Sequence, residues 1–79
     1  MREIVTETAL DRVEAGDKCV IVRTADDVAR LSETGFIPGE TVEVLRRRKS
    51  ASVVRIRGMR VALGSEVTSR ITVRLRRHG

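Results

Sequence analysis

The sequence contains few of the residues from which catalytic and metal-binding sites are built. It has one cysteine, Cys19, one histidine, His78, and one aromatic residue, Phe36, with neither tryptophan nor tyrosine. A structural zinc site needs four nitrogen or sulfur ligands at ordered spacing, which one cysteine and one histidine do not supply. The phosphate-binding pattern G-x-x-x-x-G-K-[ST] is absent as well. We therefore predict no catalytic residues, no cofactor and no metal ligands, and we expect the chain to act by binding a partner.

The sequence also lacks paired cysteines and long apolar segments. A secreted domain of this size is usually held by several disulfides, so a single cysteine favours a reducing compartment. Residues 1–10 contain no apolar run of the signal-peptide kind, and no run approaches the ~20 residues of a membrane span. We expect a soluble, cytoplasmic protein that forms a single domain over residues 1–79, with a core of about residues 10–76.

Positive and negative charges are distributed unevenly along the chain. Residues 1–45 carry 5 Lys/Arg and 10 Asp/Glu, whereas residues 46–79 carry 11 Lys/Arg and 1 acidic residue. The net charges of the two halves are −5 and +10, which give the overall +5. Unless the fold interleaves the two halves, the domain is an electrostatic dipole. Its basic half suits an anionic partner, such as a nucleic acid, a phospholipid surface or an acidic protein patch.

Short stretches of alternating apolar and polar residues dominate the chain and predict a mainly β fold. Five such stretches occur, at residues 19–23, 41–44, 54–57, 60–63 and 71–76. The last four have the period of two that places apolar side chains on one face of a strand, and residues 19–23 are rich in β-branched residues and predict a strand with both faces partly covered. Five short strands joined by tight turns usually close into a small barrel or an orthogonal sandwich, because closure hides the edge strands.

Residues 24–35 interrupt this alternation and predict one short helix between the first and second strands. Thr24 and Asp26 are rival N-caps, and Asp26 and Asp27 suit the positive end of the helix dipole. These aspartates could also hold a hard cation weakly, but capping explains them better. Gly35 suits the left-handed position that ends a helix.

Glycine and proline mark the turns between the predicted strands. Pro38-Gly39 fits the two central positions of a type II turn. Residues 46–51 predict a charged hairpin loop, and residues 57–60 predict a tight reversal. Residues 64–66 begin a short helical turn before the last strand.

Several of these features together resemble a known family. Residues 31–45 have the pattern L-x-x-x-G-F-x-P-G-x-x-V-x-V-L, residues 58–63 have G-x-x-V-A-L, and Ile71-Thr72-Val73 follows. The pattern resembles the FeoA family, small cytoplasmic SH3-like proteins of the bacterial and archaeal ferrous-iron uptake system. The resemblance spans about Leu10 to Val73. It implies a small five-stranded SH3-like barrel with one short helix inserted between the first and second strands.

The resemblance also implies a role and a partner. FeoA proteins associate with FeoB, the membrane ferrous-iron transporter with a cytoplasmic G-protein domain, and family descriptions include transition-metal binding. The resemblance thus implies a non-enzymatic accessory module that modulates a FeoB-type transporter. The same domain type ends the iron- and manganese-dependent repressors of the DtxR kind, so a stand-alone regulatory domain is an alternative. This chain departs from the family at residues 47–51, where many members have proline or glycine in the hairpin.

Apolar residues around the end of the predicted helix are the candidate partner site. Phe36 either packs in the core or anchors a partner, because aromatic side chains concentrate binding energy at interfaces. One helix on a small barrel cannot bury every apolar residue around it, so we expect part of this set to be exposed. The candidate residues are Val28, Leu31, Phe36, Ile37 and Pro38.

Basic residues of the second half form a second candidate surface. We expect them to converge on one face of the sheet, where they would suit phosphate groups or an anionic inner-membrane face. The sheet has no aromatic platform for stacking bases, which argues against nucleic acid as the partner and keeps it as the alternative. An unpaired edge strand would also permit self-association. The basic residues are Arg46, Arg47, Arg48, Lys49, Arg55, Arg57 and Arg60.

Overall fold

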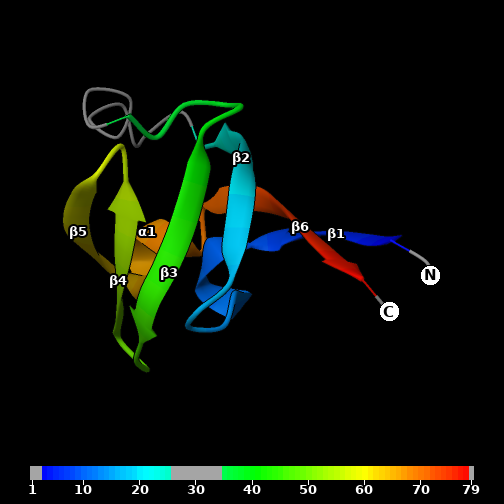
Figure 1. The fold of residues 1–79 in the computed structure, drawn as a ribbon. Helices are drawn as coiled ribbons and strands as arrows, with labels where there is room; N and C mark the ends of the chain where they lie inside the picture. The colour runs from blue at the N-terminus through cyan, green and yellow to red at the C-terminus, as the bar shows by residue number, and fades with distance from the viewer. Residues whose placement is uncertain (1–2, 26–34, 79) are drawn as a thin grey trace.

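The computed structural model describes residues 3–25 and 35–78, which form one antiparallel sheet of six strands (Figure 1). The strands are β1 (Glu3–Ala9), β2 (Lys18–Thr24), β3 (Thr41–Arg47), β4 (Ala51–Ile56), β5 (Met59–Gly64) and β6 (Ile71–His78). A 3-10 turn, η1 (Leu10–Arg12), follows β1, and a helix of four residues, α1 (Ser65–Thr68), precedes β6. The predicted mainly β class is confirmed.

The sheet is open, so the prediction of a five-stranded closed barrel is wrong. Its strand order is β1-β6-β2-β3-β4-β5, and within the described residues no ladder joins β1 to β5. The pairing register shifts between Ile21 and Arg23 in β2 and between Val44 and Arg46 in β3. Such bulges bend a strand and increase its twist. The sheet therefore curves around its core without closing.

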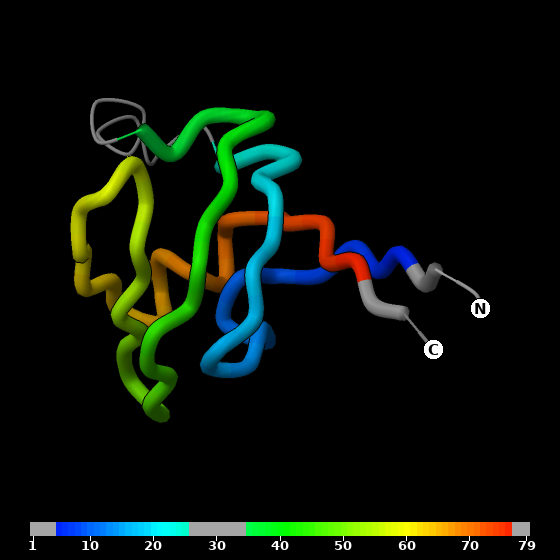
Figure 2. Tube along the Cα trace, in the orientation of Figure 1, coloured from blue at the N-terminus to red at the C-terminus, as the bar shows by residue number. Residues whose placement is uncertain are grey.

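The additional strand, β1, pairs with β6 from Glu3↔His78 to Ala9↔Thr72. Its residues 5–7 are exposed, including Val5 at 51%. A strand with little buried surface lacks the alternation by which strands are predicted from sequence. In Figures 1 and 2 the outer part of this pair extends from the body as a narrow arm that carries both chain ends. Backbone hydrogen bonds to β6 define β1.

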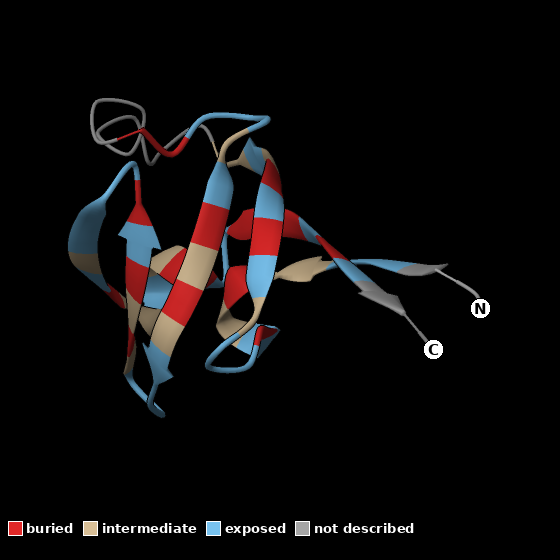
Figure 3. Cartoon of the chain, in the orientation of Figure 1, coloured by how far each residue is buried: buried red, intermediate tan, exposed pale blue. Residues whose placement is uncertain are grey.

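The hydrophobic core covers the concave side of the curved sheet. Buried and exposed residues alternate along β2 and β3, as the bands of colour in Figure 3 show. Phe36, which precedes β3, is the largest fully buried side chain, and Leu10 from η1 packs into the same cluster. Val67 of α1 packs against this cluster and is itself partly buried. The core thus joins the sheet to segments that connect its strands.

The predicted turns are present, and the predicted helix cannot be assessed in full. Gly39 has φ +94°, and the Glu40 amide donates to the Ile37 carbonyl at 3.1 Å, as a β-turn over these residues requires. Arg57 and Gly58 both have positive φ and form the reversal between β4 and β5. Most of the predicted helix, residues 26–34, lies outside the described residues. No helix in the described part of the chain has the length and apolarity needed to cross a bilayer.

Candidate functional site

The segment from Gly35 to Glu40 carries the described part of the predicted partner site. Two backbone hydrogen bonds join it to β2. The Gly39 amide donates to the Ile21 carbonyl at 2.8 Å, and the Ile21 amide donates to the Glu40 carbonyl at 2.9 Å. Ile37 is 36% exposed, and Pro38 is exposed beside it. These two side chains form an apolar tip on a fixed loop.

Of the other three predicted partner residues, only Phe36 lies within the described part of the chain. Phe36 is 1% exposed, so its ring packs in the core and offers no surface to a partner in this structure. Val28 and Leu31 lie outside the described residues. The described partner surface is therefore the tip formed by Ile37 and Pro38, which we call the loop tip.

Arg57 connects the loop to the turn between β4 and β5. Its Nη2 lies 3.1 Å from Glu40 Oε1, and its Nε–H donates to the same oxygen at 3.1 Å. Its Cδ would lie 2.9 Å from a Cβ at position 35, where glycine also adopts φ +100°. Gly35 thus allows both the backbone conformation and the close approach of Arg57.

The predicted basic residues are all exposed. Arg55 and Arg60 are direct cross-strand partners on the outer side of β4 and β5. Arg60 and Arg46 also line a hollow of about 440 Å³ whose other lining residues are Leu45 and Val53. Arg57 lies at the turn next to the loop tip and, together with Arg55, lines a further hollow.

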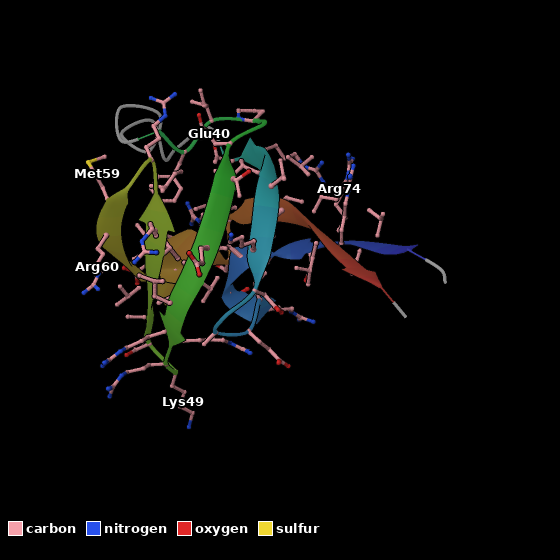
Figure 4. The ribbon with its side chains drawn as sticks, in the orientation of Figure 1. Glu40, Lys49, Met59, Arg60 and Arg74 are labelled. Carbon is pink, nitrogen blue, oxygen red and sulfur yellow. The ribbon has the colours of Figure 1, made fainter. Side chains whose placement is uncertain are left out.

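The remaining basic residues lie on the hairpin between β3 and β4, at the other end of the sheet. Figure 4 shows Lys49 at the tip of this hairpin and Glu40 at the opposite end. The hairpin is closed by the Arg48 amide, which donates to the Ala51 carbonyl at 2.8 Å. A hollow of about 390 Å³, which we call the hairpin pocket, is lined by Asp11, Arg47, Arg48, Lys49, Ser52, Ser65 and Thr68.

The sequence analysis missed four members of the hairpin pocket. Asp11 comes from η1, Ser65 and Thr68 come from α1, and Ser52 comes from β4. One signal was available for Ser52, because it occupies a position of the β4 alternation that points to the core. A polar residue at such a position requires an explanation. The other three are brought to the hairpin by the fold, and their spacing in sequence gives no indication of it.

The fold interleaves part of the acidic half of the chain with part of the basic half. β6, from the basic half, lies between β1 and β2 from the acidic half. Glu7 of β1 lies 3.6 Å from both Arg74 of β6 and Arg23 of β2. The expected charge dipole is therefore reduced at this end of the sheet, and four successive cations, Arg46 to Lys49, lie on the β3–β4 hairpin.

Cys19 is a core residue of β2 and is only 3% exposed. Its thiol donates to the Val42 carbonyl at 3.7 Å. Burial, together with the nearby Asp17 carboxylate, raises the pKa of the thiol from 9.0 to about 11. Because the thiolate is the nucleophile, this environment suppresses its reactivity at neutral pH.

We expect Cys19 to react with a disulfide reagent at pH 7.5 roughly 100-fold more slowly in the folded protein than in urea, because its pKa is about two units higher. The raised pKa also stabilises the fold below pH 9, and this contribution is lost as the pH rises toward 11. Unfolding curves between pH 8 and 11 measure the loss, with Cys19→Ala as the control that lacks it. Equal labelling rates with and without urea contradict the assignment.

Metal-binding groups are sparse in this structure. Among residues 3–25 and 35–78, no three His, Cys, Asp or Glu side chains lie together in a group that could hold a metal ion.

Comparison with known proteins identifies close matches in fold. The model of the FeoA domain family matches residues 8–75. A crystal structure of an iron uptake regulatory protein, FeoA, superimposes with a TM-score of 0.82 at 25% identity and covers 91% of this chain and 99% of that chain. The FeoA protein from Chlorobium tepidum superimposes with a TM-score of 0.78 at 26% identity, over 86% of this chain and 70% of that chain.

The same fold also occurs within larger proteins. A manganese-dependent transcriptional repressor matches with a TM-score of 0.78 at 24% identity, over 89% of this chain but only 42% of the repressor. That likeness concerns the fold alone. No protein of curated function matches the chain in sequence.

Proposed function

Because this chain belongs to the FeoA family, we propose that it is a non-enzymatic accessory module of ferrous-iron uptake that binds and modulates a FeoB-type transporter from the cytoplasmic side. The family match over residues 8–75 is the observation that carries this proposal. The proposed unit is a single domain spanning residues 1–79. The structural neighbour described as an iron uptake regulatory protein supports the link to iron uptake.

The loop tip is the proposed contact with the transporter. It combines exposed apolar surface at Ile37 and Pro38 with a backbone that is held to β2 by hydrogen bonds. A fixed apolar contact loses little conformational entropy on binding, which favours affinity. The module would modulate the transporter by binding one of its conformations more tightly than another.

The basic β3–β4 hairpin supports a second element of the proposal, peripheral association with an anionic inner-membrane face. Exposed Lys and Arg side chains near such a surface each contribute on the order of 1 kcal/mol. Four successive cations, Arg46 to Lys49, lie on this hairpin. Binding to anionic vesicles should therefore weaken as salt is added, and binding unaffected by salt would contradict this element.

A second candidate function is regulatory, as a stand-alone relative of the corresponding part of metal-dependent repressors. The observation in its favour is the fold shared with the manganese-dependent repressor. Titration with Mn²⁺ or Fe²⁺ separates the two functions. A regulatory domain should show metal-dependent changes in backbone amide resonances, whereas the transporter-binding module should bind its partner without added metal.

We expect Ile37→Asp to weaken binding to the cytoplasmic domain of a FeoB-type transporter by at least tenfold, because it places a charge in an apolar contact. Calorimetric titration with the purified domain measures the affinity. Val5→Asp is the matched control, because Val5 is 51% exposed and lies on β1, away from the loop tip. Equal affinities for Ile37→Asp and the wild type, with both proteins folded, exclude the loop tip as the contact.

A further inference from the structure

The hairpin pocket is lined by a serine whose hydroxyl has no hydrogen-bond partner among the described residues. Ser52 is only 4% exposed and lines the pocket from β4. Within the described part of the chain, its side chain makes no hydrogen bond. The Ser52 hydroxyl is therefore available to a polar occupant of the pocket.

A buried polar atom of the same pocket is unsatisfied, and native structures rarely keep such an atom unless water or a ligand satisfies it. Asp11 Oδ1 is buried and has no hydrogen-bond partner among the described residues. Thr68, by contrast, uses its hydroxyl locally, with the carbonyl oxygens of Gly64 and Ser65 at 3.4 and 3.3 Å. The pocket thus offers the hydroxyl groups of Ser52 and Ser65 and one buried carboxylate acceptor, at Asp11.

The charged residues of the pocket determine the sign of the charge that its occupant carries. Arg47, Arg48 and Lys49 line it, and none of them has an ion-pair partner within residues 3–25 and 35–78. With the Asp11 carboxylate included, these side chains carry a net charge of +2. Arginine guanidinium groups bind phosphate oxygens through paired hydrogen bonds, and lysine adds a compact positive charge. These charges select an anion.

We propose that the hairpin pocket binds a phosphate ester that also carries a hydroxyl group. The phosphate would accept hydrogen bonds from the Ser52 hydroxyl and from the basic side chains of the hairpin, and the ligand hydroxyl would donate to Asp11. A volume of about 390 Å³ exceeds that of a phosphate ion and lies in the range of small-ligand sites. Glycerol phosphate has this chemistry, either as a soluble molecule or as the headgroup of phosphatidylglycerol.

Three ligands test the proposal by titration of the ¹⁵N-labelled protein. Glycerol 3-phosphate should bind more tightly than methyl phosphate, which lacks the hydroxyl groups, and more tightly than inorganic phosphate. The amides of residues 47–52 and 65–68 should shift most. Asp11→Asn removes a negative charge from the pocket, so methyl phosphate should bind it more tightly than it binds the wild type. Glu14→Gln is the matched control, because Glu14 is exposed and does not line the pocket.

Variants separate a built site from general attraction to a basic surface. Ser52→Ala leaves the charge unchanged and should weaken glycerol 3-phosphate binding roughly tenfold, the effect of losing a hydrogen bond to a charged group. Arg48→Gln should weaken binding to a similar extent. Arg60→Gln removes one positive charge from the outer side of the sheet and should change the affinity for glycerol 3-phosphate less than twofold. Thermal unfolding establishes that each variant is folded.

Vesicles distinguish the two sources of the phosphate ester. The protein is sedimented with vesicles of phosphatidylcholine and phosphatidylglycerol at 3:1. If the lipid headgroup enters the pocket, Ser52→Ala should reduce the fraction of protein that sediments. If the protein binds glycerol 3-phosphate but not the vesicles, the ligand is a soluble ester. If Ser52→Ala binds every ligand as the wild type does, or if Arg60→Gln loses as much affinity as Arg48→Gln, water fills the pocket and the proposal is overturned. The pocket and the loop tip lie at opposite ends of the sheet, so each can be tested without disturbing the other (Figure 4).

Discussion

Replacing Phe36 with alanine is expected to destabilise the domain by about 3–5 kcal/mol, the range measured when a buried phenylalanine is truncated. Phe36 is the only aromatic residue in the sequence and the largest fully buried side chain of the core. A domain of 79 residues has a total stability of roughly 4–12 kcal/mol. The loss therefore amounts to a large part of the stability, and a substantial fraction of the molecules should be unfolded at 37 °C.

Urea unfolding monitored by circular dichroism measures this effect. Phe36→Leu keeps most of the apolar volume and should cost far less, about 1–1.5 kcal/mol. Ile37→Ala, at the neighbouring but exposed position, should cost less still. If Phe36→Ala and Ile37→Ala shift the unfolding midpoint equally, Phe36 does not have the core position described above.

Replacing Val73 with aspartate is expected to destabilise the domain at least as much as Phe36→Ala does. Val73 is 0% exposed in β6, where it faces Thr8 of β1 and Ile21 of β2 across the two ladders. A carboxylate at this position would be buried without a partner, and an unpaired buried charge costs on the order of 3–5 kcal/mol. We expect the variant to be largely unfolded at neutral pH.

Val20→Asp is the matched control for this substitution. Val20 is 38% exposed on the outer face of β2 and lies opposite Arg74, so the new carboxylate remains solvated and near a cation. The same exchange should therefore cost little more than the lower strand propensity of aspartate, ~1 kcal/mol at most. Burial raises the pKa of an aspartate at position 73, so that variant should regain stability as the pH falls from 7 toward 4. A Val73→Asp protein as stable as Val20→Asp contradicts the packing.

The sequence allowed most of the sheet to be predicted, because strands with one buried face have a visible period of two. The stretches at 19–23 and 71–76 fall within β2 and β6 almost residue for residue. The alternation failed for β1, whose exposed residues 5–7 bury no apolar stripe, and so one strand was missed. Closure into a barrel was inferred from the usual behaviour of five strands. That prediction was wrong, because the additional strand, β1, pairs with β6 and is itself an edge of the sheet.

The candidate sites were only partly predictable, because each depends on contacts between distant segments. Part of the apolar set around the predicted helix end was expected to be exposed, and Ile37 and Pro38 are exposed in the structure. Phe36 was ambiguous from sequence, because one apolar residue beside a turn can face either way. The basic residues were grouped by their proximity in sequence, but the strand directions separate Arg57 at one end of the sheet from Lys49 at the other (Figure 4).

The position of β6 within the sheet has a consequence for the order of folding. β6 is the last strand along the chain, yet it lies between β1 and β2, which come first. The β2–β3–β4–β5 meander can pair in sequence order, whereas β1 has no strand partner until β6 arrives between it and β2. Contacts between such distant segments slow folding, because loop-closure entropy is lost before they form. The sheet is therefore completed only after residues 71–78 have been synthesised, and until then β1 lacks the strand with which it pairs.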